Sequence, residues 1–411
     1  MANTIKLGTD SNWAVKENNL LAYNDENNIF KPIDFDFTRD SGATRVNEQG
    51  LIENVPIGVP RIDFSDGKGS LLLEPQSTNL ITYSEDFDNS YWTKLNSTIT
   101  SNSEISPNGT QNADKLVDNT VNTAHRFIST GFSTTSVNYT ASIFVKKDEI
   151  RYTYLRVNDS SGTYISGTFD LQDGVVTQEE NGDLSIENFG NGWYRIIGTA
   201  TSNANGLSYL ELRTSKTPIY SNYIGNGSDG LYVWGAQAEA LSYATSYIPT
   251  NGSTVTRLAD VCNNAGSSDL INSTEGVLYA EISALADDET DKRIALSDGT
   301  MNNYVSIGYS RFSGNIISEI ISGGVLQTVN WGATGVTQTN NNKFALSWGS
   351  GTMKFYVNGT QTNIENVTSP IGMNDLRFSA VNDTLPMFSN TRDLRVYNTA
   401  LTDAELIALT S

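Results

Sequence analysis

Apolar and polar residues alternate along most of the chain from about residue 80 to the end. Residues 139–145 show the period of two that is typical of a half-buried strand. Residues 193–197 and 231–234 are rich in the aromatic and β-branched residues that strands favour. Between such segments stand pairs that favour tight hairpins: Asp173-Gly174, Asn181-Gly182, Asn191-Gly192 and Asn226-Gly227. Because a period of 3.6 is almost absent, we predict an all-β chain.

The second half repeats this pattern with a different sequence. Residues 277–282 form its first predicted strand, and residues 353–357 form another, followed by the turn pair Asn358-Gly359. On a predicted strand between them, Phe344, Leu346 and Trp348 occupy alternate positions and therefore share one face. The pattern indicates a second antiparallel β-sandwich.

One short helix is predicted at the C-terminus. Thr402 and Glu405 have the spacing of a capping box. Leu401 can pack against Leu406 across the first turn, which would fix the direction in which the chain enters the helix.

The length of 411 residues favours two or three domains. Residues 251–268 are rich in Asn, Gly and Ser and form the best linker candidate, with a boundary near residue 262. In the first 75 residues, prolines interrupt short apolar pieces, at Pro32, Pro56, Pro60 and Pro75. We therefore predict an extended N-terminal arm over residues 1–75 and two antiparallel β-sandwiches, over residues 76–261 and 262–411.

Composition narrows the classes of partner. Hydrophobic residues make up 38% and aromatic residues 10% of the chain, enough for folded cores. The formal charge of −20 repels phosphate backbones, so we expect no nucleic-acid partner. No apolar run is long enough for a membrane-spanning helix, and the first residues lack the apolar core of a secretion signal. With Cys262 as its only cysteine, the chain forms no internal disulfide.

The sequence lacks the residues that most catalytic mechanisms require. His125 is the only histidine, and it lies in residues 123–127, which have the pattern of an ordinary strand. A Ser-His-Asp triad or a zinc site is therefore not expected, and no glycine-rich nucleotide motif follows a strand. We expect a protein that is not an enzyme. Glycoside hydrolysis stays open as an alternative because it needs only two carboxylates, and the chain has 46 acidic residues.

Several stretches resemble proteins encoded by tailed phages. The sequence FTRDSGATRVN at residues 37–47, continued by PRIDF at 60–64, resembles the lead-in of phage fibre and structural proteins. A longer series is similar to the carbohydrate-binding-module-like jelly roll of phage virion proteins: TNL at 78–80, SEDF at 84–87, YWTK at 91–94, PNGT at 107–110, ADKL at 113–116, VWGAQAE at 233–239, ATSYIPT at 244–250 and TVTR at 254–257. Residues 343–359, 393–397 and 401–406 are similar to concanavalin- or laminin-G-like sandwiches.

These resemblances imply a head or tail fibre or capsid decoration subunit, made in the host cytoplasm and released in the virion by lysis. They imply a homotrimer, an arm that binds other virion proteins, and adhesion to host-surface or environmental glycans such as bacterial surface polysaccharide. Weak contacts would be multiplied by the number of copies on each particle. The alternatives are a purely structural decoration protein that binds no sugar, and a polysaccharide depolymerase.

Sugar binding needs aromatic side chains that stack on pyranose rings beside polar neighbours. The candidates in the first sandwich are Tyr152 and Tyr154, which share a strand face, with Tyr164, Tyr220 and Tyr223. Those in the second are Tyr304, Tyr309 and Trp331. The alternative for each is a core or rim aromatic, and we expect Trp92, Trp193 and Trp234 to lie in the core.

An acidic cluster is the candidate metal site. Asp287, Asp288, Glu289 and Asp291 stand in a predicted loop, and carboxylate oxygens suit a hard cation such as calcium. The alternative is a solvated run of charges. The resemblance to calcium-holding jelly rolls implies a structural calcium, and no other cofactor is expected.

Overall fold

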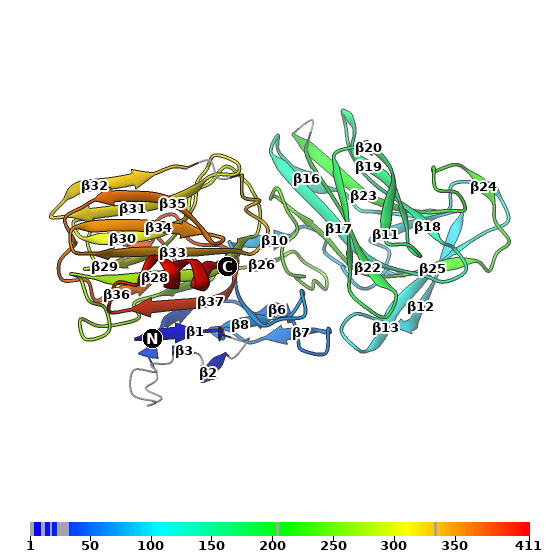
Figure 1. Ribbon diagram of the computed structural model, residues 1–411. Coiled ribbons are helices and arrows are strands. Elements are labelled where there is room, and N and C mark those ends of the chain that lie inside the picture. Colours follow the sequence, from blue (N-terminus) through cyan, green and yellow to red (C-terminus); the bar gives the residue numbers. More distant parts are fainter. Residues whose placement is uncertain (1–3, 10–12, 17–18, 23–32, 203–204, 333–334) are drawn as a thin grey trace. The chain divides into compact units, whose positions relative to one another are not determined.

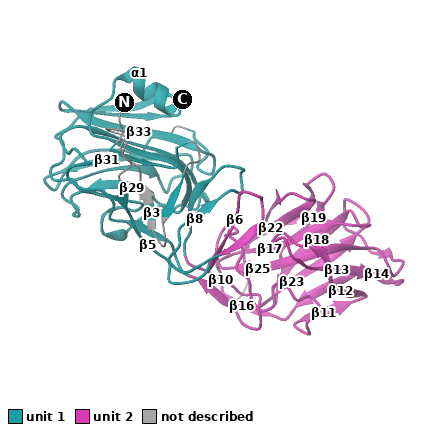
Figure 2. Cartoon of the chain, turned by 90° about the horizontal axis from the view of Figure 1, so that it is seen from below, with its two compact units in different colours: residues 1–42, 55–75, 258–411 teal, residues 43–54, 76–257 magenta. Residues whose placement is uncertain are grey.

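The computed structural model describes residues 4–9, 13–16, 19–22, 33–202, 205–332 and 335–411. Within this part, the chain forms two compact units (Figure 2). Unit 1 comprises Met1–Gly42, Val55–Pro75 and Leu258–Ser411, and unit 2 comprises Ala43–Asn54 and Gln76–Arg257. Both units are built of antiparallel strands, as the alternating pattern predicts.

Unit 2 is a sandwich of antiparallel sheets, which we call the front sheet and the back sheet (Figure 1). The front sheet has the strand order β11 (Trp92–Leu95), β15 (Arg126–Ser129), β23 (Gly206–Ser215), β18 (Tyr152–Asp159), β19 (Gly162–Asp170) and β20 (Val175–Asn181), with β16 (Phe132–Thr134) also paired to β23. The back sheet has the order β12 (Ser97–Ile105), β13 (Gln111–Asp118), β25 (Gly230–Glu239), β17 (Asn138–Lys147), β22 (Trp193–Thr201) and β21 (Asp183–Asn188). A short pair, β14 (Asn122–Thr123) and β24 (Tyr223–Ile224), lies beside them.

The core of unit 2 lies between the sheets and contains Trp92, Phe127, Leu155 and Ile143. A smaller cluster covers the other face of the back sheet, where Trp193 and Trp234 pack with Phe144, Tyr247 and Ile52. Ile52 comes from the hairpin of β6 (Ala43–Val46) and β7 (Ile52–Val55). The prediction that Trp92, Trp193 and Trp234 are core residues is confirmed.

Unit 1 is also a sandwich. Its main sheet has the order β35 (Thr360–Asn366), β34 (Thr352–Val357), β33 (Asn342–Gly349), β28 (Gly276–Ala284), β37 (Ser389–Tyr397), β9 (Ser70–Leu73) and β8 (Arg61–Asp63), with β1 (Ile5–Leu7) also paired to β37. The facing sheet has the order β32 (Val325–Asn330), β31 (Ile316–Ser322), β30 (Tyr304–Tyr309), β29 (Lys292–Ser297) and β36 (Asp375–Arg377). Phe344, Leu346 and Trp348 all lie in the core between them, which confirms that they share one face.

Strands from the predicted arm belong to these sheets. β1, β8 and β9 are paired into the main sheet because Ile5, Leu7, Leu71 and Leu73 bury their side chains in the core of unit 1. Further short strands lie in the same region: β2 (Ala14–Lys16), β3 (Asn19–Ala22) and β4 (Ile33–Asp34). Residues 1–3, 10–12, 17–18 and 23–32 of the predicted arm, which include Pro32, lie outside the described residues.

The predicted linker also contains paired strands. β26 (Val255–Arg257) pairs with β10 (Ser77–Asn79), and β27 (Val261–Asn263) pairs with β5 (Asp36–Thr38). The chain passes from unit 2 into unit 1 between Arg257 and Leu258, a few residues before the predicted boundary. Long-range pairing gives this segment its structure despite its turn-like composition.

A buried ion network joins distant segments of unit 1. Asp260 lies 3.0 Å from the Nη1 atom of Arg39 and also pairs with Arg61, which in turn lies 2.5 Å from Glu74. The side chains of Arg39, Arg61 and Asp260 are fully buried. Although burial opposes the charged form, the carboxylates of Glu74 and Asp260 raise the pKa of Arg61 above its ordinary value.

The helix α1 (Asp403–Thr410) begins at the predicted capping box, with the Glu405 amide donating to Thr402 Oγ1. Leu401 and Leu406 share a cluster with Val277 and Tyr356 on the main sheet, as the predicted packing requires. A short 3-10 helix, η2 (Val381–Asp383), precedes β37. Among the described helices, none has the length and apolar character needed to cross a membrane.

Candidate functional site

The outer face of the front sheet carries a cluster of arginines and tyrosines. Along β18, Leu155 and Val157 point into the core, so Tyr154 and Arg156 lie on the opposite face. The register of the sheet places Arg213 of β23 opposite Tyr154. It places Glu211 opposite Arg156, and Arg126 of β15 opposite Arg213 on its other side. Cross-strand neighbours on one face lie close enough for their side chains to interact.

Glu211 is the centre of this cluster. Its side chain is only 2% exposed, and it accepts a hydrogen bond from Arg213 Nε at 2.5 Å. Arg126 Nε and Arg156 Nη1 lie 3.1 Å and 3.4 Å from its oxygens. Although burial acts to lower it, the hydrogen bond and the charge of Glu211 raise the pKa of the Arg213 guanidinium. One carboxylate therefore orients the arginines of three adjacent strands.

Tyr154 and Tyr220 form an aromatic pair beside these arginines. Their ring centroids lie 4.6 Å apart, and the Arg213 guanidinium lies 5.3 Å from the first and 4.9 Å from the second. The Tyr220 amide donates to Gln178 Oε1 at 2.9 Å, which anchors its loop on β20. Tyr154 is buried, which raises its pKa to about 12, whereas Tyr220 is half-buried and presents ring surface. We call Arg126, Tyr154, Arg156, Glu211, Arg213 and Tyr220 the Arg–Tyr face.

The other tyrosines predicted in unit 2 make separate contacts, although Tyr152 shares the outer face of β18 with Tyr154 as predicted. Tyr152 is half-buried at the start of β18, with the Arg151 guanidinium 5.2 Å from its ring centroid. Tyr164 is buried and donates to Ser208 at 2.9 Å. Tyr223 is half-buried, and its hydroxyl lies 2.7 Å from that of Thr214.

The candidates in unit 1 are dispersed as well. Tyr304 and Tyr309 are buried, and Tyr309 donates to the carbonyl of Ile282 at 2.8 Å, so its ring belongs to the core. Trp331 is 37% exposed and packs near Phe312 and Arg311. The sequence could not separate Trp331 from the buried tyrosines because turn-forming residues stand near all three in the sequence, although the two tyrosines begin and end β30.

The predicted metal cluster does not converge. Asp287 accepts from Ser313, Asp288 from Lys292 Nζ at 2.5 Å, and Asp291 from a backbone amide at 2.7 Å. Glu289 has a φ of 59°, a left-handed conformation at the turn. Over the described ranges, no group of three or more His, Cys, Asp or Glu side chains has an arrangement that could hold a metal ion.

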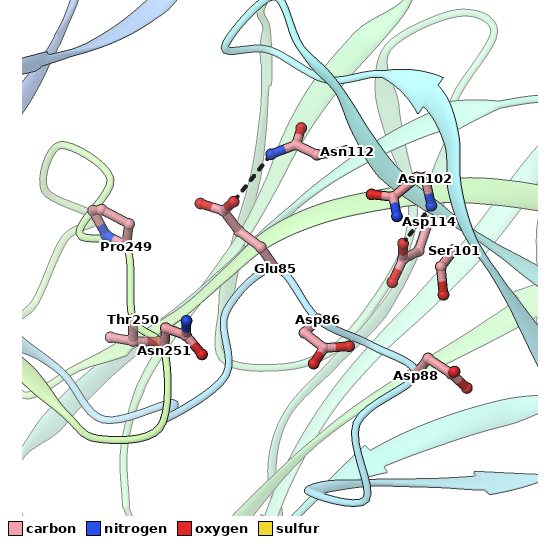
Figure 3. Close-up of a pocket in the computed structure, with 10 residues that line it drawn as sticks. All are labelled: Glu85, Asp86, Asp88, Ser101, Asn102, Asn112, Asp114, Pro249, Thr250 and Asn251. Carbon is pink, nitrogen blue, oxygen red and sulfur yellow. Dashed lines mark hydrogen bonds between the residues drawn. The ribbon is translucent and has the colours of Figure 1, made fainter.

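A polar pocket of about 520 Å³ lies elsewhere in unit 2 (Figure 3). It is formed by the segment before β11, by β12 and β13, and by the segment before β26. Its lining consists of Glu85, Asp86, Asp88, Ser101, Asn102, Asn112, Asp114, Pro249, Thr250 and Asn251. Figure 3 shows Glu85 joined to Asn112, at 3.1 Å, and Asp114 joined to the amide of Asn102, at 3.0 Å.

Burial and like charges perturb the acids of this pocket. Asp114 is buried, and this desolvation raises its pKa to about 6, with a further contribution from the charges of Asp86 and Asp88. Burial also raises the pKa of Glu85, which accepts from Tyr247 at 3.0 Å. Glu85, Asp86 and Asp114 fall within the jelly-roll-like motif stretches, but their spacing in the sequence does not show that they meet.

His125 is not in a regular strand as its sequence surroundings predict. It lies in the break between β14 and β15, fully buried. Its ring nitrogens lie 2.7 Å and 3.1 Å from the carbonyl oxygens of Asn96 and Tyr223. These contacts tie the break to neighbouring loops.

No family model matches the sequence, and a search of curated proteins finds no match. Among solved structures, domain 4 of the arabinanase AbnA from Geobacillus stearothermophilus, in complex with arabinotriose, is 15% identical, with a TM-score of 0.31; the match covers 41% of this chain and 81% of that one. Domains LG4-5 of the mouse laminin α1 chain are 11% identical, with a TM-score of 0.24 and coverage of 68% and 89%. A tail fibre protein from an E. coli phage is 12% identical, with a TM-score of 0.24; the match covers 78% of this chain but only 41% of that one. Similarities at this level do not assign a function.

Proposed function

We propose that this chain is a structural subunit of a tailed-phage virion, and that unit 2 adheres to glycans through the Arg–Tyr face. The virion assignment is supported by the fibre-like and jelly-roll-like motif stretches. The fold is the all-β architecture that those motifs imply. The first 75 residues contribute to this role by contacting other virion proteins, and a homotrimer presents several copies together.

The Tyr154–Tyr220 pair under Arg213 is the observation that carries glycan binding. A tyrosine ring can stack on the apolar face of a sugar, and guanidinium, carboxylate and amide groups beside it hydrogen-bond the hydroxyls. A hydrogen bond to Glu211 holds Arg213 on its strand, and a hydrogen bond to Gln178 holds the loop that carries Tyr220. A site that is held rigid loses little entropy when a ligand binds.

Adhesion by such a shallow face relies on the number of copies. When several weak sites are linked, each further contact forms at a high effective concentration, and the apparent affinity rises without a stronger individual site. A virion that presents many copies of this chain can therefore hold a polysaccharide with weak individual contacts.

Glycan arrays and saturation-transfer NMR on the full chain test this proposal. Tyr220→Ala should reduce glycan binding by about tenfold or more, because it removes the stacking surface. Trp331→Ala is the matched control, since it removes an exposed aromatic ring beside an arginine in unit 1. If Trp331→Ala abolishes binding and Tyr220→Ala does not, the site lies in unit 1. If the wild-type chain binds no glycan, the purely structural alternative holds.

Glycoside hydrolysis in the pocket of unit 2 is the second candidate function. The observation that favours it is the raised pKa of Asp114, about 6, beside the carboxylates Asp86 and Asp88. A protonated carboxyl group and an ionised one are the two roles that glycosidases require. Release of reducing ends from bacterial polysaccharide, lost in Asp114→Asn but kept in Tyr220→Ala, would establish it. Binding without release of reducing ends excludes it for the polysaccharide tested.

A further inference from the structure

The Arg–Tyr face has a local charge opposite in sign to that of the whole chain. The chain has a formal charge of −20. On this face, the arginines at 126, 156 and 213 surround Glu211, and a second carboxylate, Glu180, accepts from the Tyr154 hydroxyl at 2.7 Å. Among the described residues of the cluster, three positive groups thus meet two negative groups.

The guanidinium groups of Arg126 and Arg156 are only partly used. An arginine offers five N–H donors in a planar fork. Arg156 donates through Nε to Thr163 at 2.8 Å and through Nη1 to Glu211 at 3.4 Å. In the described part of the chain, Arg156 Nη2 and the Nη groups of Arg126 meet no acceptor. The side chain of Arg156 is 32% exposed and that of Arg126 is 29% exposed, so these donors are accessible to a ligand.

Like charges on neighbouring strands repel one another. Glu211 offsets part of this repulsion from below, where it is buried. An anion bound on the outer face of the front sheet would relieve the remaining repulsion between the arginines. Guanidinium groups bind carboxylate and phosphate with paired, charge-assisted hydrogen bonds. β15, β23 and β18 span about 10 Å, which is the scale of a sugar ring with its substituents.

We propose that the Arg–Tyr face selects sugars bearing an anionic substituent, a carboxylate or a phosphate, an inference that rests on the glycan binding proposed above. Arg126 and Arg156 hold the anionic group, and Tyr220 stacks on the ring. The ligand that this combination fits is an acidic polysaccharide, because the Tyr220 ring and the donors of Arg126 and Arg156 match a sugar ring that carries an anionic group.

Calorimetric titration of the full chain with trigalacturonic acid and with its neutral methyl ester tests the selection. The acid should bind about tenfold more tightly than the ester. Arg156→Gln and Arg126→Gln should each remove most of this difference, whereas Arg311→Gln, an arginine beside an aromatic ring in unit 1, should leave it unchanged. A phosphorylated sugar such as glucose 6-phosphate distinguishes phosphate from carboxylate as the preferred anion.

The salt dependence of the wild-type chain gives a test that needs no variant. Binding of trigalacturonic acid should weaken as the ionic strength rises, and binding of the ester should not, because surface charges are screened. Equal affinity for acid and ester at all salt concentrations would overturn the anionic selection. If Tyr220→Ala then still abolished binding of both the acid and the ester, glycan binding by the Arg–Tyr face would stand. If the wild-type chain binds neither the acid nor the ester, both the anionic selection and the glycan binding are overturned.

Discussion

Asp260 joins two buried arginines of unit 1 that lie 221 and 199 positions away along the chain. In Asp260→Asn, the charges of Arg39 and Arg61 lose their shared carboxylate partner in a fully buried site. We expect the free energy of unfolding of unit 1 to fall by about 3–5 kcal/mol, measured by urea denaturation. Asp66→Asn removes the exposed partner of Arg392 and should cost less than about 1 kcal/mol. Equal losses would show that the buried network is not a major source of stability.

Asp114 gives unit 2 a defined pH dependence. Its pKa is about 6 in the folded chain and near 3.8 in the unfolded chain, so the folded state binds more protons between these values. The free energy of unfolding should therefore decrease as the pH rises from about 4 to about 6. Above this range, the titration of Asp114 should cause no further decrease. Urea denaturation of the wild-type chain and of Asp114→Asn isolates the effect, since the variant lacks this group and keeps the others. A difference between the two that does not change with pH would contradict the assignment.

Single residues were predictable where the local pattern decides their place. The tryptophans at 92, 193 and 234 are buried as expected, because Trp92 and Trp234 stand in the jelly-roll-like motif stretches and Trp193 begins a strand rich in apolar residues. Tyr154 and Tyr220 were both candidates, but the contact between their rings could not be predicted. Tyr220 lies in a loop that is positioned by a hydrogen bond to Gln178, a contact set only by the folded sheet.

At the scale of elements, α1 depends on its N-terminal cap. Thr402→Ala removes the acceptor for the Glu405 amide and should lower stability by about 1 kcal/mol. Hydrogen exchange of the α1 amides should show the loss first, because the helix is held on the main sheet chiefly through Leu401 and Leu406. Thr399→Ala, at an exposed position just before the helix, should have little effect. An equal loss of protection in the two variants would contradict the role of the cap.

Strands were predictable where they alternate over several residues. Residues 139–145, 277–282 and 353–357 all fall within observed strands, at β17, β28 and β34. The short strands β26 and β27 were missed because three residues are too few to show a period. β26 instead pairs with β10, which lies nearly 180 positions earlier in the chain. β27 pairs with β5, which lies farther away still.

At the scale of the whole molecule, unit 1 is assembled from separated parts of the chain. β8 and β9 join the main sheet beside β37, more than 300 positions later. A chain truncated after Arg257 lacks β28, β33 and β37, so β8 and β9 have no sheet to join. We expect proteolysis within residues 61–73 of the truncated chain, detected by mass spectrometry, while residues 76–257 stay resistant. Protection of residues 61–73 in the truncated chain would instead support an N-terminal region that is ordered by itself.

The division into two all-β units could be anticipated from the change of motif along the chain, but the interleaving could not. The prolines between residues 32 and 75 indicate short, interrupted strands. They do not show that β8 and β9 complete a sheet in which most of the other strands come from the last 150 residues.

A structure of the assembled particle, determined in the presence of an acidic oligosaccharide, tests the central proposal most directly. We predict that the Arg–Tyr face is open to solvent on the particle, and that the sugar lies on Tyr220 with its anionic group beside Arg126 and Arg156. A face buried against a neighbouring subunit, or a sugar bound elsewhere on the chain, would contradict the proposed mode of adhesion.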